Sequence, residues 1–69
     1  MTWNYRILQH PEGFFNLITV YYEDETGKIV AFSENPTPAG DTVESISYDI
    51  AKMAGAIKHP ILTHDDLGQ

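Results

Sequence analysis

The stretch FFNLITVYY, residues 14–22, is the densest run of β-branched and aromatic residues in the chain. Such residues favour strands, so the run predicts the central strand of a small sheet. Side chains alternate between the two faces of a strand. One face is expected to carry Phe15, Leu17, Thr19 and Tyr21, and the other Phe14, Ile18, Val20 and Tyr22.

Two runs on either side of this stretch predict its neighbours. Residues 3–10, WNYRILQH, alternate with the two-residue period of a half-buried strand. The turn HPEG separates this strand from the central one, because Pro11 fixes φ and Gly13 tolerates a positive φ. After an acidic turn, the run KIVAFSE, residues 28–34, predicts a third strand. The tight connections predict antiparallel pairing.

A helix is predicted after the proline-bearing connection NPTPAG, residues 35–40. Asp41 is the predicted N-cap, with Glu44 three residues on as its capping-box partner at the positive end of the helix dipole. The helix should end near Lys58 or His59, because Pro60 disfavours α geometry in the residue before it. Apolar residues at three- and four-residue steps predict the face packed on the sheet: Val43, Ile46, Ile50, Met53 and Ile57.

Together these elements predict an α+β fold, a three-stranded antiparallel meander with one helix packed on one face, in the order β-β-β-α. A chain of 69 residues forms one domain, residues 1–69. The short polar tail at residues 63–69 is predicted to be flexible. One helix covers only one face of a sheet, so the other face is predicted to be open for a second copy or another partner.

The charge of the chain is strongly negative. Ten acidic residues against four basic ones give a formal charge of −6. Such a balance repels nucleic-acid phosphates and anionic lipid, so no direct binding to nucleic acid or membrane is expected, and it favours basic protein partners. The sequence has no cysteine, no signal-peptide pattern and no apolar run of the ~18 residues that span a bilayer, which is compatible with the cytoplasm.

No pattern in the sequence predicts catalysis, a metal site or a cofactor. Glu23, Asp24 and Glu25 are adjacent, whereas calcium loops alternate their ligands and end in a bidentate glutamate. His59 and His64 lie on either side of a proline, and no cysteine completes a transition-metal set. Nucleophile-elbow, dinucleotide and Walker motifs do not occur. We therefore expect a non-enzymatic protein without catalytic or metal-binding residues.

Acidic residues on successive elements are the candidate partner-binding residues. Carboxylates spaced several Å apart on a rigid scaffold resemble a row of phosphates and can occupy a cationic groove made for nucleic acid. A merely solvated surface is the alternative. The candidates lie on the acidic turn, the third strand, the connection and the helix: Glu23, Asp24, Glu25, Glu34, Asp41, Glu44 and Asp49.

Four motifs carry a resemblance to known proteins: WNYR at residues 3–6, VYYEDETGKIV at 20–30, ENP at 34–36 and HPIL at 59–62. They resemble a group of small bacterial proteins without an assigned activity, which implies a fold alone. In size and acidity the chain is also similar to anti-CRISPR proteins of phages and mobile elements, especially the small acidic inhibitors of type I-C systems. That resemblance implies a DNA mimic that blocks the DNA-contacting surface of a Cas8-type subunit of Cascade in the host bacterial cytoplasm.

The alternative hypothesis is a bacterial protein–protein interaction domain. It would dimerise, or bind another protein as a monomer, through its open sheet face. Exposed tyrosine and tryptophan side chains would supply the binding energy there, because these residues are enriched at interface hot spots. The two hypotheses differ in whether carboxylates or aromatic side chains make the contact.

Overall fold

The structure is a computed structural model that describes residues 1–68. Its elements in chain order are β1 (Thr2–Gln9), β2 (Phe15–Tyr22), β3 (Ile29–Glu34), α1 (Val43–Ala54), the 3₁₀ helix η1 (Gly55–Lys58), β4 (Leu62–Thr63) and the 3₁₀ helix η2 (Asp65–Leu67). This arrangement confirms the predicted α+β class. The predicted number of strands is wrong, because four strands form the sheet, in the order β3-β2-β1-β4.

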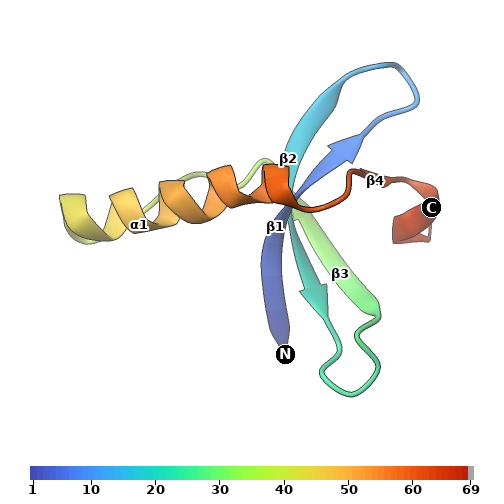
Figure 1. The fold of residues 1–69 in the computed structure, drawn as a ribbon, viewed down its shortest axis with the longest axis horizontal. Helices are drawn as coiled ribbons and strands as arrows, with labels where there is room; N and C mark the ends of the chain where they lie inside the picture. The colour runs from blue at the N-terminus through green and yellow to red at the C-terminus, as the bar shows by residue number, and fades with distance from the viewer. Residues whose placement is uncertain (69) are drawn as a thin grey trace.

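The sheet is mixed, which also corrects the predicted antiparallel meander. β1 pairs with β2, and β2 with β3, in the antiparallel sense, with Tyr5 opposite Thr19. β4 adds a short parallel pairing on the free edge of β1, where Leu62 lies opposite Leu8. The two hairpins extend in opposite directions from the crossing of the strands (Figure 1). Gly13 and Gly27 sit in their turns with φ of 102° and 71°, values that glycine adopts without strain.

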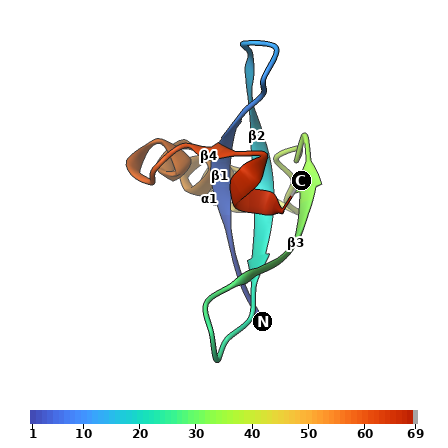
Figure 2. The same ribbon diagram turned by 90° about the vertical axis from the view of Figure 1, so that its right-hand side faces the viewer.

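The hydrophobic core lies on the sheet face that carries the even-numbered residues of β2. Ile18 and Val20 are completely buried there beside Leu8. Leu62 of β4 completes this cluster, and Leu67 of η2 packs against it. Figure 2 shows η2 in front of the sheet and α1 behind it, so the C-terminal segment covers the core face and the helix does not.

The tail has more structure than its polar sequence suggests. The flexible segment was predicted at residues 63–69; residues 63–68 contain the end of β4 and all of η2, and residue 69 lies outside the described residues. Asp66 Oδ2 accepts hydrogen bonds from the Thr63 backbone N–H at 2.8 Å and from the Thr63 hydroxyl at 3.1 Å. These bonds form the turn that brings Leu67 onto the core.

The helix begins and ends close to the predicted positions. Its N-cap is Thr42 and not Asp41, because the Thr42 side chain accepts a hydrogen bond from the Ser45 backbone N–H at 3.1 Å. Beyond Ala54 the chain tightens into η1, which ends at Lys58, two residues before Pro60. Among residues 1–68, no helix has the length and apolar character needed to cross a membrane.

The predicted contact face of the helix is wrong, because the helix meets β1 through Asp49 and Lys52 and not through its apolar stripe. No residue of α1 is buried, although its apolar residues form the expected stripe. The connection at residues 35–42 runs outward beside the helix, so α1 starts far from the sheet and returns to it only at its C-terminal end (Figure 1). We call residues 35–42 and α1 together the α1 arm. Because Leu62 and Leu67 already cover the core, the arm is left to project into solvent.

Candidate functional site

The acidic turn between β2 and β3 is an exposed hairpin tip, which contains Glu23, Asp24 and Glu25. The Asp24 carboxylate accepts from the N-terminal amine at 2.8 Å and from the Thr2 hydroxyl at 2.7 Å. These two donors, the amine first, hold the pKa of Asp24 below its usual value. Asp24 therefore ties the N-terminus to the tip, and all three acidic residues of the tip are exposed.

Asp49 accepts two hydrogen bonds from other parts of the chain. Its Oδ1 accepts from the Tyr5 hydroxyl at 2.7 Å, and its Oδ2 accepts from the Ala39 backbone N–H at 3.2 Å. The Tyr5 bond, followed by the Ala39 bond, lowers the pKa of Asp49. Burial, followed by the bond to Asp49, raises the pKa of Tyr5 to about 12. Asp49 thus links β1, the connection and α1, and its carboxylate tethers the arm to the sheet.

The remaining predicted site residues lie at two further places. Glu34, at the end of β3, has its carboxylate 3.8 Å from His10 Nε2. Asp41 and Glu44 lie at the outer end of the α1 arm, and the hairpin tip lies at a different extremity of the molecule (Figure 1). The structure therefore brings together Glu23, Asp24 and Glu25 but does not gather all seven predicted carboxylates on one surface.

An exposed apolar stripe runs along α1. Val43 is 81% exposed, Ile50 50% and Ile57, just beyond the helix in η1, 78%. Ile46 and Met53 of the same stripe are half-buried, because they lie on the flank that faces the rest of the protein. A helical turn has 3.6 residues, so residues seven positions apart lie on nearly the same line. Val43, Ile50 and Ile57 form that line, and we call it the α1 stripe.

The arm is held at its base by contacts on the opposite flank of the helix. The Lys52 ammonium lies 4.5 Å from the centre of the Trp3 ring, a cation–π contact. Trp3 in turn meets the ring of Tyr5 edge-to-face, with ring centres 5.2 Å apart. Ala56 of η1 is buried beside β1. These contacts fix the direction of α1 and leave the α1 stripe facing away from the sheet.

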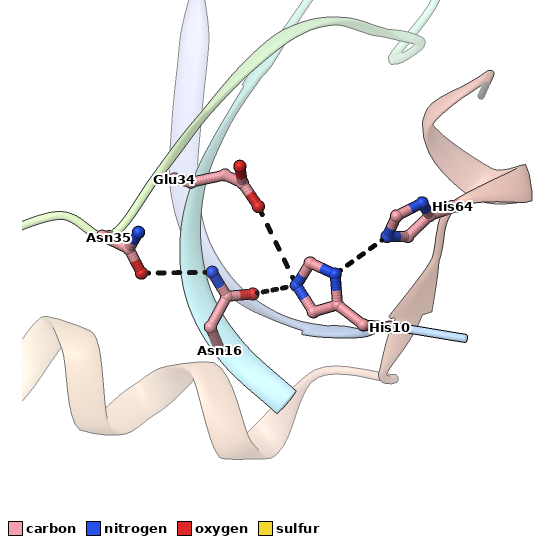
Figure 3. Close-up of polar contacts among 5 residues, drawn as sticks. All are labelled: His10, Asn16, Glu34, Asn35 and His64. Carbon is pink, nitrogen blue, oxygen red and sulfur yellow. Dashed lines mark hydrogen bonds and ion pairs between the residues drawn. The ribbon is translucent and has the colours of Figure 1, made fainter. Parts of the chain in front are cut away.

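A second polar feature is the hydrogen-bond chain around His10 (Figure 3). His10 Nε2 lies 2.8 Å from Asn16 Oδ1, and His10 Nδ1 lies 3.1 Å from His64 Nε2. Asn16 Nδ2 donates to Asn35 Oδ1 at 3.2 Å, which leaves Asn16 Oδ1 as an acceptor. His10 Nε2 therefore donates to Asn16, and its Nδ1 shares the other hydrogen bond with His64.

This chain of bonds is structural in character. The His10 ring is buried and stacks on Phe14, with ring centres 4.2 Å apart. Both ring nitrogens are occupied by protein partners, so His10 has no free atom for a substrate or metal. Across residues 1–68, no group of three or more histidine or acidic side chains is placed to hold a metal ion. The contacts connect the first turn, the end of β3 and the C-terminal segment.

Sequence reasoning found the α1 stripe but assigned it to the core. The amphipathic period of residues 43–57 was a correct signal of a helix with one apolar face. It contained no information on which surface that face would meet. The contact of His10 with His64 was also missed, because it joins residues from opposite ends of the chain.

Comparisons with known proteins found no relative of this chain. No family model, no curated protein and no solved structure matches the chain. The candidate site therefore rests on the geometry of the chain itself.

Proposed function

We propose that this chain is a non-enzymatic protein-binding module and that the α1 stripe is its contact surface. The observation that carries the proposal is an amphipathic helix without a single buried residue. An apolar face of this kind gains free energy when it leaves water, at about 25 cal/mol per Å². Exposed apolar residues that form a continuous patch are typical of interaction sites, whereas scattered ones are not.

The shape of the arm supports a helix-in-groove mode of binding. In that mode, anchors at positions i, i+3, i+4 and i+7 of an amphipathic helix enter an apolar groove of the partner. Val43 and Ile50 occupy positions i and i+7 of this pattern, and Ile57 continues the line into η1. The tether through Asp49 and the Lys52–Trp3 contact hold the helix before any partner arrives. A preorganised helix loses less conformational entropy on binding than a disordered segment.

The rest of the chain supports a binding function over a catalytic one. Among residues 1–68, the titratable groups with displaced pKa values are Tyr5, Asp24 and Asp49, and each makes a contact within the protein. Perturbed groups of an enzyme would instead converge on a cleft. We propose that the module acts in the bacterial cytoplasm without a cofactor, in keeping with a sequence that has no cysteine.

The anti-CRISPR hypothesis is a second candidate and stays a prediction. It is favoured by the charge of −6 and by the exposure of Glu23 and Glu25 at the hairpin tip. A mimic of DNA needs a row of carboxylates, and the candidate residues lie at separate extremities, so the hairpin tip alone would have to enter the cationic groove. Capture of a Cas8-type subunit that is displaced by duplex DNA would support it.

The test of the main proposal compares two substitutions of equally exposed apolar residues. Ile50→Glu places a charge in the α1 stripe, and Phe15→Glu places one on the sheet; Ile50 is 50% and Phe15 53% exposed. Each immobilised variant is offered an extract of the bacterium that encodes the chain, and the retained proteins are quantified by mass spectrometry. We expect Ile50→Glu to retain a specific partner at least about tenfold less than wild type, because burying a charge in an apolar contact opposes binding.

Phe15→Glu is the matched control and should retain the partner at the wild-type level. Both variants must keep the far-ultraviolet circular dichroism of the wild type, so that a loss of binding does not reflect unfolding. If Ile50→Glu retains the same proteins in the same amounts as wild type, the α1 stripe is not the contact surface. If only Phe15→Glu loses the partner, the sheet face is the contact surface.

A further inference from the structure

We infer that the occupant of the α1 stripe is a second copy of this chain, paired antiparallel about a twofold axis that passes beside Ile50. The inference rests on the proposed function of the stripe as a contact surface. It goes further, because it names the partner and the relative direction of the two helices. Three properties of the described residues support it: the excess surface, the distribution of charge along the arm, and the symmetry of the stripe.

The surface area fits a small dimer. The chain exposes 4864 Å², whereas folded monomers of 7.8 kDa typically expose about 4400 Å². The excess is therefore about 500 Å² per chain. The radius of gyration, 12.7 Å, likewise exceeds the value of about 11 Å expected for a compact chain of this length. Two copies that hide this excess bury about 1,000 Å² in total, which is the lower limit for a biological interface and fits a weak dimer.

The charges along the arm favour the antiparallel direction. Asp41 and Glu44 lie at the outer end of the arm, and Lys58 lies toward the sheet, whereas Lys52 is held by Trp3 on the opposite flank. An antiparallel pair places the acidic end of each arm near the basic end of the other, and it also sets the two helix dipoles in opposition. A parallel pair would bring like charges together. Each arm would then reach the base of its partner's arm, where Ile57 is exposed.

Repulsion between two chains of charge −6 each does not prevent this arrangement. The hairpin tip lies away from the arm, at another extremity of the molecule (Figure 1). Exposed charges separated by more than about 8 Å are largely screened at physiological ionic strength. The charges that face the interface are therefore mainly those of the arms, which complement one another in the antiparallel direction.

The symmetry of the stripe places the axis. Ile50 lies midway between Val43 and Ile57. In a twofold pair, the residue at the axis contacts its own copy, and residues on either side contact each other. Residues seven positions from the axis lie about 10 Å along the helix from it, so two copies of Val43 would be about 21 Å apart. Val43 of one chain would instead meet Ile57 of the other.

The first experiment measures the mass of the protein by sedimentation equilibrium from about 1 µM to about 1 mM, a range that covers weak and moderate dimers. We expect wild type and Phe15→Glu to shift from monomer toward dimer with the same dissociation constant. Ile50→Glu should bind itself at least about tenfold more weakly, because two glutamates would meet at the axis. A wild type that remains monomeric throughout, or an Ile50→Glu variant that dimerises as wild type does, would overturn the inference.

The second experiment uses disulfide crosslinking, which is clean because the chain has no cysteine of its own. Under mild oxidation Ile50→Cys should crosslink to itself, whereas Val43→Cys alone should not, because disulfides require Cα atoms within about 7 Å. A mixture of Val43→Cys and Ile57→Cys chains should form the mixed disulfide. Tyr48→Cys, exposed on the other flank of α1, is the control that should stay reduced. Rapid self-crosslinking of Val43→Cys would show a parallel pair and overturn the antiparallel inference.

The two proposals fail in different ways. If the wild type is monomeric and Ile50→Glu still loses a different captured protein, the inference of a second copy is wrong and the proposed function stands. If the wild type dimerises but Ile50→Glu neither weakens that dimer nor loses any captured partner, the α1 stripe is not a contact surface and both are wrong.

Discussion

Replacing Ile18 by alanine tests the position of the hydrophobic core. Ile18 is completely buried between Leu8, Val20 and the C-terminal segment. The change removes three carbon atoms from the core, worth about 0.8 kcal/mol each, or about 2.4 kcal/mol. The cavity that remains adds about 1 kcal/mol or more, since the neighbours relax only in part. We expect a loss of about 3–4 kcal/mol, most of the stability that a domain of this size has.

The matched change is Ile50→Ala, which tests the helix face that the sequence alone assigned to the core. Ile50 is 50% exposed, so about half of the transfer free energy is lost, about 1.2 kcal/mol, and no closed cavity forms. Alanine also has the higher helix propensity, by about 0.4 kcal/mol. The net loss should stay below about 1 kcal/mol. For a chain of 69 residues, 1 kcal/mol changes the melting temperature by about 7 °C.

Thermal and urea unfolding at about 1 µM protein measure both variants under conditions that keep association weak. We expect the melting temperature to fall by about 20 °C or more for Ile18→Ala and by less than about 7 °C for Ile50→Ala. The reasoning is refuted if the two variants lose equal stability, because α1 would then pack into the core in solution. It is also refuted if Ile18→Ala melts as the wild type does.

Three further predictions concern the tether, the C-terminal segment and the hairpin tip. The pKa of Tyr5 is raised from 10.0 to about 12 in the folded state, so neutral Tyr5 stabilises the protein fully below pH 10, and this contribution is lost as the pH rises toward 12. Tyr5→Phe should therefore lower the melting temperature by about 5–10 °C at pH 7, and between pH 9 and 11.5 its melting temperature should fall by less than that of the wild type. An equal fall in both proteins would contradict the tether. Removal of residues 62–69 should abolish the fold, because Leu62 and Leu67 cover the core; a truncated chain with a dispersed NMR spectrum would show that the segment is dispensable. If the α1 stripe is the contact surface, neutralising the tip with Glu23→Gln, Asp24→Asn and Glu25→Gln should leave partner capture unchanged. A loss of capture at low salt would instead favour the anti-CRISPR hypothesis.

The lowered pKa of Asp49 gives the corresponding prediction on the acid side. A carboxylate whose pKa is lower in the folded state stabilises the protein above its ordinary value of 3.8 and loses this contribution as the pH falls through the lower folded value. Acid unfolding followed by circular dichroism should therefore show that the wild type loses stability below pH 3.8 more steeply than Tyr5→Phe, which lacks the hydroxyl that donates to Asp49. Identical acid transitions would show that this bond does not contribute.

The local pattern of the sequence was enough to place the main elements. The β-branched run at residues 14–22 and the alternation at residues 3–10 predicted β2 and β1 to within one residue at each end, and the tight turn between them predicted their antiparallel pairing. The period of residues 43–57 predicted a helix that stops before Pro60. These features depend on interactions between residues close in the chain, which is why a sequence shows them. The identity of the N-cap was missed by one residue, because Asp41 and Thr42 both carry a suitable side-chain oxygen.

The partners of the apolar faces were decided only by the tertiary structure. Leu67 lies in a short polar segment that has no periodicity, yet it packs beside Leu62 on the core face of the sheet. The seven acidic candidates lie on several elements, and their separation follows from the direction in which the α1 arm leaves the sheet (Figure 1). An amphipathic pattern requires that an apolar face be covered but does not specify what covers it, because the hydrophobic effect is not directional. Which surface covers the apolar face of a helix therefore depends on which contacts fit in three dimensions.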